Sequence, residues 1–167
     1  MRYIACLILT LMVGNSYAAV VNGTSVQVTM SATYVIPTCD ITMPTLVPFP
    51  NHILVGTTAK VSESFSVGVS CSHVVATSLR FVAANVDTSL ATPWANKLTV
   101  GGAVTNAHLG LVNQANGQYM LLDGSYSVDN CNGSGDYTCS ITADILPNGL
   151  TQTGLFSEAV VVSVVFN

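Results

Sequence analysis

The sequence predicts an all-β protein folded as a sandwich of two sheets, and three observations lead to this fold class. Apolar and polar residues alternate with a period of two in several short segments, which is the pattern of half-buried strands. Turn signals such as Asn116-Gly117 and Asp123-Gly124 separate these segments. No amphipathic helix is evident after residue 18. Short strands joined by regular turns are typical of a β-sandwich.

The amino-terminal residues predict a secretory leader. Arg2 supplies the positive charge, Ile4 to Val13 the apolar run, and Ser16-Tyr17-Ala18 the small-residue cleavage motif. An apolar run of about ten residues is too short to span a bilayer. We therefore expect cleavage between Ala18 and Ala19, and divide the chain into a signal peptide (1–18), an amino-terminal extension (19–30) and one domain (31–167).

The charge of the expected mature chain excludes one class of partner. Without Arg2, the cations are Lys60, Arg80 and Lys97, against the 8 acidic residues of the chain. Three cations are too few to bind nucleic-acid phosphates, so we expect no nucleic-acid partner. Charged residues make up only 7% of the sequence, which leaves the surface poorly protected from association.

Four cysteines remain after the leader: Cys39, Cys71, Cys131 and Cys139. An even number in an exported chain favours disulfides. Three pairings are possible, and we favour Cys39–Cys71 with Cys131–Cys139, because the second pair brackets a short loop rich in Gly, Asn and Asp. A zinc site is the weaker alternative, since the spacing lacks a CxxC motif.

The expected strands follow the alternating segments in order. They are Ser31–Thr38, Lys60–Cys71, Thr77–Ala84, Lys97–Val100, Ala107–Val112, Gln118–Leu122, Tyr137–Ile145 and Ala159–Phe166. Pro44, Pro48 and Pro50 make the segment after Cys39 irregular or edge-like, because proline donates no ladder hydrogen bond.

The last strand is apolar on both faces. Val160, Val162, Val164 and Phe166 share one face, and Val161 and Val165 lie on the other. Such a strand is buried on both sides or borders a deep groove, and the pattern leaves open which face meets that groove. An open apolar edge invites pairing with another chain.

The extension after the leader has the matching pattern. Thr24, Val26, Val28 and Met30 repeat at period two and have no hairpin partner nearby. The extension is either the first strand of its own sandwich or, as we favour, a spare strand for another copy.

No motif predicts catalysis, a cofactor or a metal site. His52, His73 and His108 are dispersed and no GxSxG motif accompanies them. The Asn- and Asp-rich loop 129–136 does not have EF-hand spacing, and its closure by two cysteines explains its composition better than calcium does. Trp94 is more simply explained by packing than by contact with a sugar or a receptor.

The order of these motifs resembles the subunits of chaperone–usher pili. A leader and an alternating arm precede a strand ending in Cys39 (ATYVIPTCDI), a second strand ends in Cys71 (FSVGVSC), and the printed sequence closes on an apolar strand with Phe166 next to last. The ending GLFSEAVVVSVVF also looks like that of the archaic, spore-coat-U-like branch.

The resemblance implies an incomplete immunoglobulin-like sandwich that lacks its seventh strand. The acceptor groove would lie between Ser31–Thr38 and Val160–Phe166. A periplasmic chaperone would fill this groove first, and at the outer-membrane usher the arm of the next subunit would replace it by donor-strand exchange. Val26, Val28 and Met30 would enter the groove, and basic residues of the chaperone would hold the carboxylate of Asn167.

The resemblance also implies a function and a location. The chain would be a non-enzymatic structural subunit of a surface fimbrium that contributes to adhesion; the alternative is a single-domain adhesin that binds a host receptor or glycan.

Two features depart from the family pattern. Thr24 stands where many pilins carry glycine, and many lack the pair Cys131–Cys139, which we expect to stiffen a surface loop.

Overall fold

The computed structural model describes residues 35–49 and 56–167. The chain divides into two compact units, Met1–Val35 and Ile36–Asn167, and the fold described here is that of the second. The predicted leader (1–18), the whole of the predicted arm (19–30) and the first half of the predicted first strand (31–34) lie outside the described residues, as does His52. All regular structure in the described part is β. No helix long and apolar enough to cross a membrane occurs there.

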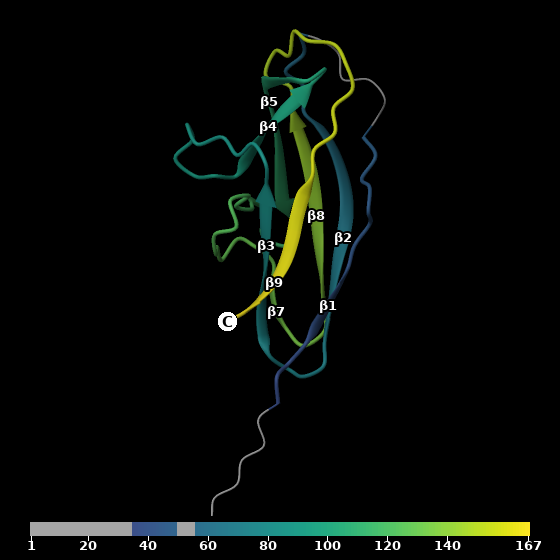
Figure 1. The fold of residues 1–167 in the computed structure, drawn as a ribbon, viewed down its shortest axis with the longest axis vertical. Helices are drawn as coiled ribbons and strands as arrows, with labels where there is room; N and C mark the ends of the chain where they lie inside the picture. Colours follow the sequence, from purple (N-terminus) through teal and green to yellow (C-terminus); the bar gives the residue numbers. More distant parts are fainter. Residues whose placement is uncertain (1–34, 50–55) are drawn as a thin grey trace, which may run out of the picture. The chain divides into compact units, whose positions relative to one another are not determined.

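The described residues form nine strands in two antiparallel sheets (Figure 1). They are β1 (Cys39–Thr42), β2 (Val61–Cys71), β3 (Ala76–Ala83), β4 (Ala95–Val100), β5 (Ala103–Asn113), β6 (Gln118–Tyr119), β7 (Asn132–Ser134), β8 (Tyr137–Leu146) and β9 (Val160–Phe166). The large sheet has the order β1-β2-β8-β5-β4, with β6 paired to β5, and the small sheet has the order β7-β3-β9.

The core lies between the inward faces of the two sheets. Alternation along each strand sends every second side chain inward, so both sheets contribute fully buried residues. From the small sheet come Leu79 and Phe81, each 0% exposed, and from the large sheet come Val67, Ile141 and Ile145, also 0% exposed. The predicted all-β sandwich is therefore confirmed.

Most predicted strands are present, with altered ends. The expected strand 107–112 begins four residues earlier, at Ala103, and the expected strand 118–122 shortens to Gln118–Tyr119. The short β7 within the cysteine loop was not predicted.

The prediction of a first strand over Ser31–Thr38 is wrong in its described part. Residues 35–38 form no strand, and the first strand begins at Cys39. Pro37 gives the reason, because proline has no N–H for a ladder and restricts the residue before it. Pro44 has the same effect at the other end, where β1 stops at Thr42.

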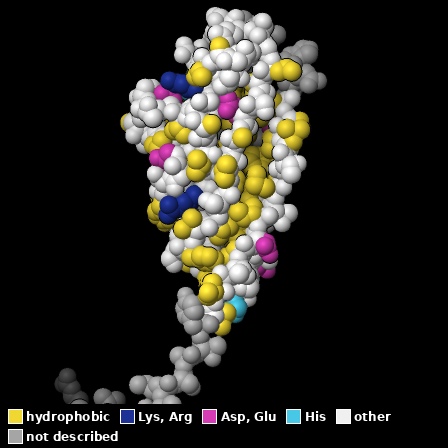
Figure 2. Space-filling view, in the orientation of Figure 1, with side chains coloured by type: hydrophobic (Ala, Val, Ile, Leu, Met, Phe, Trp, Pro, Cys, Tyr) yellow, Lys and Arg dark blue, Asp and Glu magenta, His cyan; other side chains and the backbone are white. Residues whose placement is uncertain are grey.

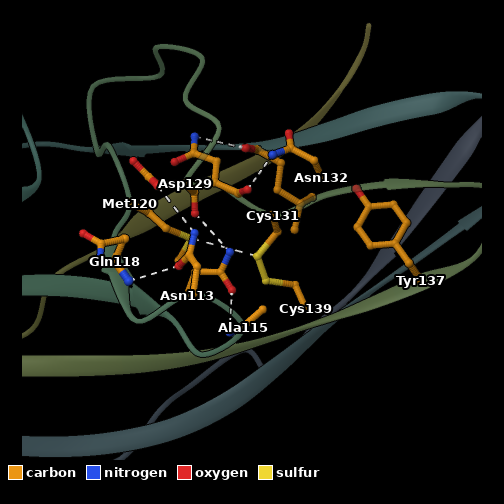
Figure 3. Close-up of a disulfide and its surroundings, with 12 residues drawn as sticks. Asn113, Ala115, Gln118, Met120, Asp129, Cys131, Asn132, Tyr137 and Cys139 are labelled. Atoms are coloured by element: carbon orange, nitrogen blue, oxygen red, sulfur yellow. Dashed lines mark hydrogen bonds between the residues drawn. A yellow bond between two sulfur atoms is a disulfide. The ribbon is translucent and has the colours of Figure 1, made fainter.

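Both favoured disulfides are present. Cys39 and Cys71 are direct partners in the β1–β2 ladder, so their bond fixes the edge strand to the large sheet. Cys131 immediately precedes β7 of the small sheet, whereas Cys139 lies in β8 of the large sheet. Both residues are only 5% exposed, so this bond joins the two sheets within the core instead of stiffening a surface loop as expected (Figure 3).

The amide-rich loop before this disulfide is held by its own hydrogen bonds. Asn113 donates to the Asp129 carbonyl at 3.0 Å and accepts from the Ala115 N–H at 3.0 Å, while Asn132 donates to the Asn130 carbonyl at 2.7 Å (Figure 3). Among the residues described, no three His, Cys, Asp or Glu side chains are grouped as metal ligands. Backbone capping therefore accounts for the composition of this loop.

Trp94 packs against the outer face of the large sheet. Its ring lies 4.4 Å from that of Tyr119, measured between centroids, and both rings press on Gly110, where a Cβ atom would come within 2.7 Å of Tyr119. The Tyr119 hydroxyl donates to the fully buried Asp144 at 3.0 Å, and Lys60 bonds the same carboxylate at 3.0 Å. Burial, and then the hydrogen bond to Asp144, raise the pKa of Tyr119 to about 12. The tryptophan thus has a packing role, as expected.

Candidate functional site: an open groove beside β9

β9 has one edge that no described strand pairs with. Its other edge is bonded to β3 along its whole length, from Thr77 opposite Phe166 to Ala83 opposite Val160. β9 thus ends the small sheet in the described part of the chain. An unpaired strand edge presents a row of free N–H and C=O groups, and such edges accept strands from other chains.

An apolar cavity of about 930 Å³ opens beside this edge. Its floor is the inward face of the large sheet, one wall is the start of β9, and the other wall is the segment Met43–Phe49 that follows β1. The floor side chains include Phe65, Leu109, Leu111, Ala143 and Ile145. Figure 2 shows hydrophobic side chains gathered in a band alongside β9, on the side toward β2.

The structure distinguishes the two faces of β9, which the sequence pattern left open. Val160 and Val162 line the cavity, and Val164 packs against the core further along the same face. Phe166, the last of the four residues predicted for the groove, is 48% exposed and does not line the cavity. Val161 points to the opposite face and is 64% exposed.

Exposure along β2 locates the uncovered part of the core. Val67 and Val69 are 0% and 3% exposed, whereas Val61 and Phe65, on the same face, are only partly buried. The sandwich is therefore closed near the β1 end of β2 and open toward its beginning.

Among the described residues the second wall is Met43–Phe49, and residues 35–38 of the predicted wall Ser31–Thr38 do not line the cavity. Met43–Phe49 forms this wall without a ladder, because Pro44 and Pro48 interrupt it. Phe49 contacts Phe156 with ring centroids 6.2 Å apart, and both residues line the cavity. The described wall therefore offers mainly side chains, whereas β9 offers free backbone groups.

Glu158 anchors the loop that precedes β9. Its carboxylate accepts from the Thr99 N–H at 2.8 Å and from the Asn96 side chain at 3.3 Å, both in β4. These bonds tie the loop that precedes β9 to the large sheet at the cavity. Sequence reasoning did not assign this residue a role, although it stands within the quoted ending GLFSEAVVVSVVF.

The described histidines do not form a catalytic arrangement. His108 bonds Asp87 at 2.9 Å through Nε2 and Asn148 at 2.8 Å through Nδ1, while His73 bonds its neighbour Ser72. Neither histidine bonds both a hydroxyl and a carboxylate, the linkage that activates a serine nucleophile.

The nearby serine binds the carboxylate instead. Ser89 donates to Asp87 from both its hydroxyl, at 2.6 Å, and its backbone N–H, at 3.0 Å. These two bonds, followed by those from His108 and Lys97, hold the pKa of Asp87 well below its usual range. The carboxylate of Asp87 is therefore ionised and contacts Ser89, His108 and Lys97.

Comparison with known proteins gives a likeness of fold. No protein-family model and no curated protein matches the sequence. A chain from the structure of a chaperone–usher pilus, determined to explain rod uncoiling, superposes with a TM-score of 0.54 at 14% identity, covering 90% of this chain and 100% of the other. An antigen and type I fimbria protein of Burkholderia pseudomallei gives a TM-score of 0.46 at 21% identity, covering 77% and 98%. The first of these likenesses shows that the described sandwich shares its fold with a chain of that pilus.

Proposed function

We propose that this chain is a structural subunit of a chaperone–usher fimbria that polymerises by donor-strand exchange. The observation that carries the proposal is the free edge of β9 beside an apolar cavity of about 930 Å³. The arm 19–30 of another copy is the proposed occupant, with Thr24, Val26, Val28 and Met30 facing the cavity. The likeness to a chain of a chaperone–usher pilus supports the same function.

The energetics favour occupation of the groove. Each backbone group that is buried without a partner costs about 1–3 kcal/mol, and a strand paired to β9 removes that cost. Each apolar side chain that such a strand buries contributes about 1.5–3 kcal/mol. Several side chains and a ladder together give a junction that dissociates very slowly.

The proposal includes a transport route and partners. A subunit with an open groove needs protection before assembly, so a periplasmic chaperone holds it and an outer-membrane usher exchanges that chaperone for the next subunit. The predicted leader fits export, and the low charge content fits a chain that functions in a polymer. Adhesion is then a property of the assembled surface fimbrium.

A deletion separates the donor role of the arm from the acceptor role of the domain. Removing residues 19–29 should leave capture by the cognate chaperone intact, because the groove is unchanged, but should stop the subunit from acting as a donor. Co-purification with the chaperone and electron microscopy of surface fibres are the two measurements. Normal fibres made solely from the deleted chain would refute the proposal.

A further inference from the structure

The inward face of β2 carries one acidic residue within the stretch that lacks cover. Glu63 alternates with Val61 and Phe65 on the face that meets the core, and all three are partly exposed. Phe65 lines the cavity, and so does Ala143, the direct cross-strand partner of Glu63. Glu63 does not itself line the cavity, but it lies beside two residues that do.

Glu63 differs from the other carboxylate at this cavity. Glu158 accepts two hydrogen bonds from β4. For Glu63, the part of the chain that the structure describes provides neither a hydrogen bond nor an ion pair. A strand that covers Val61 and Phe65 would also remove water from this carboxylate, and a carboxylate that loses water without gaining a partner is costly.

The proposed occupant has a polar group on the matching face. In the arm 19–30, Thr24 shares its face with Val26, Val28 and Met30. The threonine hydroxyl is a hydrogen-bond donor, and a bond from a hydroxyl to a carboxylate is among the stronger ones in proteins. The Thr24 hydroxyl, which precedes three apolar residues on its face, thus matches an acid beside an otherwise apolar floor.

We infer that Glu63 is a specificity-determining residue of the groove, whose carboxylate accepts a hydrogen bond from the Thr24 hydroxyl of the inserted strand. The inference rests on the proposed function and deepens it. A strand shifted by two residues so that Val26 replaced Thr24 would place an apolar side chain against the carboxylate, so the pair disfavours that register. This hydrogen bond adds to the apolar contacts between the inserted strand and the groove, and those contacts form without it.

Competition between two peptides tests the inference on the full mature chain. The chain is refolded with equal excesses of the peptide 19–30 and of the same peptide carrying Thr24→Val, which keeps the shape and removes the hydroxyl. Native mass spectrometry then gives the ratio of the two complexes. The ratio is measured for the wild-type chain, for Glu63→Gln, for Glu63→Leu, and for Asp40→Leu, a matched loss of an exposed carboxylate on β1.

The ratio of bound threonine peptide to bound valine peptide should be at least about tenfold higher for the wild-type chain than for Glu63→Leu. The reason is that Glu63→Leu loses the hydrogen bond to a charged acceptor. Glu63→Gln keeps an acceptor and should keep the direction of the preference, and Asp40→Leu should match the wild type. Equal ratios for wild type and Glu63→Leu, with peptide bound to both, would overturn the inference and leave the proposed function standing. Failure of every chain to retain either peptide would overturn both.

Discussion

Substitution of Val162 by aspartate tests whether the face of β9 that carries Val162 meets the inserted strand. Val162 lines the cavity and lies opposite Phe81, a residue 0% exposed, in the β3–β9 ladder. In the proposed assembled state, a donor strand covers it. The substitution therefore removes an apolar contact and places a carboxylate where no water remains.

The size of the effect follows from two terms. Loss of the buried valine side chain costs about 1.5–3 kcal/mol. Enclosing an unpaired carboxylate costs several kcal/mol more, even after the surroundings relax. A total of about 4–5 kcal/mol corresponds to roughly a thousandfold weaker binding of a strand, at about 1.4 kcal/mol for each factor of ten.

The adjacent residue provides a matched control. Val161→Asp makes the same chemical change in the same strand, but at a side chain that is 64% exposed on the opposite face. Changes at such surface positions usually stay within about 0.5 kcal/mol. Retention of the peptide 19–30 by refolded chains is the assay, with chaperone co-purification as a second readout. Equal retention by the Val162→Asp and Val161→Asp chains would refute the assignment of the groove face.

Two further predictions concern the fold itself. Tyr119→Phe should lower the free energy of unfolding by about 1 kcal/mol, because the buried Asp144 loses one of its hydrogen bonds, and urea titration measures the change. Since the pKa of Tyr119 is raised to about 12 from 10.0, its contribution is present below pH 10 and is lost as the pH rises through about 12, a dependence that the phenylalanine variant should lack. Replacing the cysteines pairwise by alanine should cost more for Cys39–Cys71, with a sequence separation of 32, than for Cys131–Cys139, with a separation of 8. The chain-entropy model gives about 3.7 and about 2.5 kcal/mol; the reverse order in thermal unfolding would show that core packing around the second bond dominates.

The fold class and most strands could be predicted because their information is local. Period-two alternation in Val61–Cys71 and Tyr137–Leu146 is set by which face of the sheet is buried, and both strands appear nearly as expected. The short spacing of Cys131 and Cys139 likewise indicated their pairing. The alternation of the sequence continues through Pro37, but this proline takes no part in a ladder, so the first described strand begins at Cys39 and not within Ser31–Thr38.

The site depended on contacts that sequence patterns do not contain. The four residues predicted on β9 share one face. Only the packing of the large sheet against the small sheet shows that the cavity ends before Phe166. The wall formed by Met43–Phe49 has no ladder partner in the described part of the chain, and its sequence shows no period-two alternation. Glu158 acts through β4, which lies about sixty residues earlier in the sequence, and no local pattern indicates such a pair.

The central claim is that the arm of one copy pairs with β9 of another, and cross-linking between two differently tagged chains tests it most directly. One chain carries Gln27→Cys, on the outward parity of the arm. The other carries a cysteine in place of Val161, Ser163 or Val165, which alternate on the outward face of β9, or in place of Thr138 on β8 as a control. After joint refolding and mild oxidation, we predict a disulfide between the two chains at one or two adjacent β9 positions and none at residue 138. Absence of a link at all three β9 positions, or a link at residue 138 of equal yield, would contradict the account.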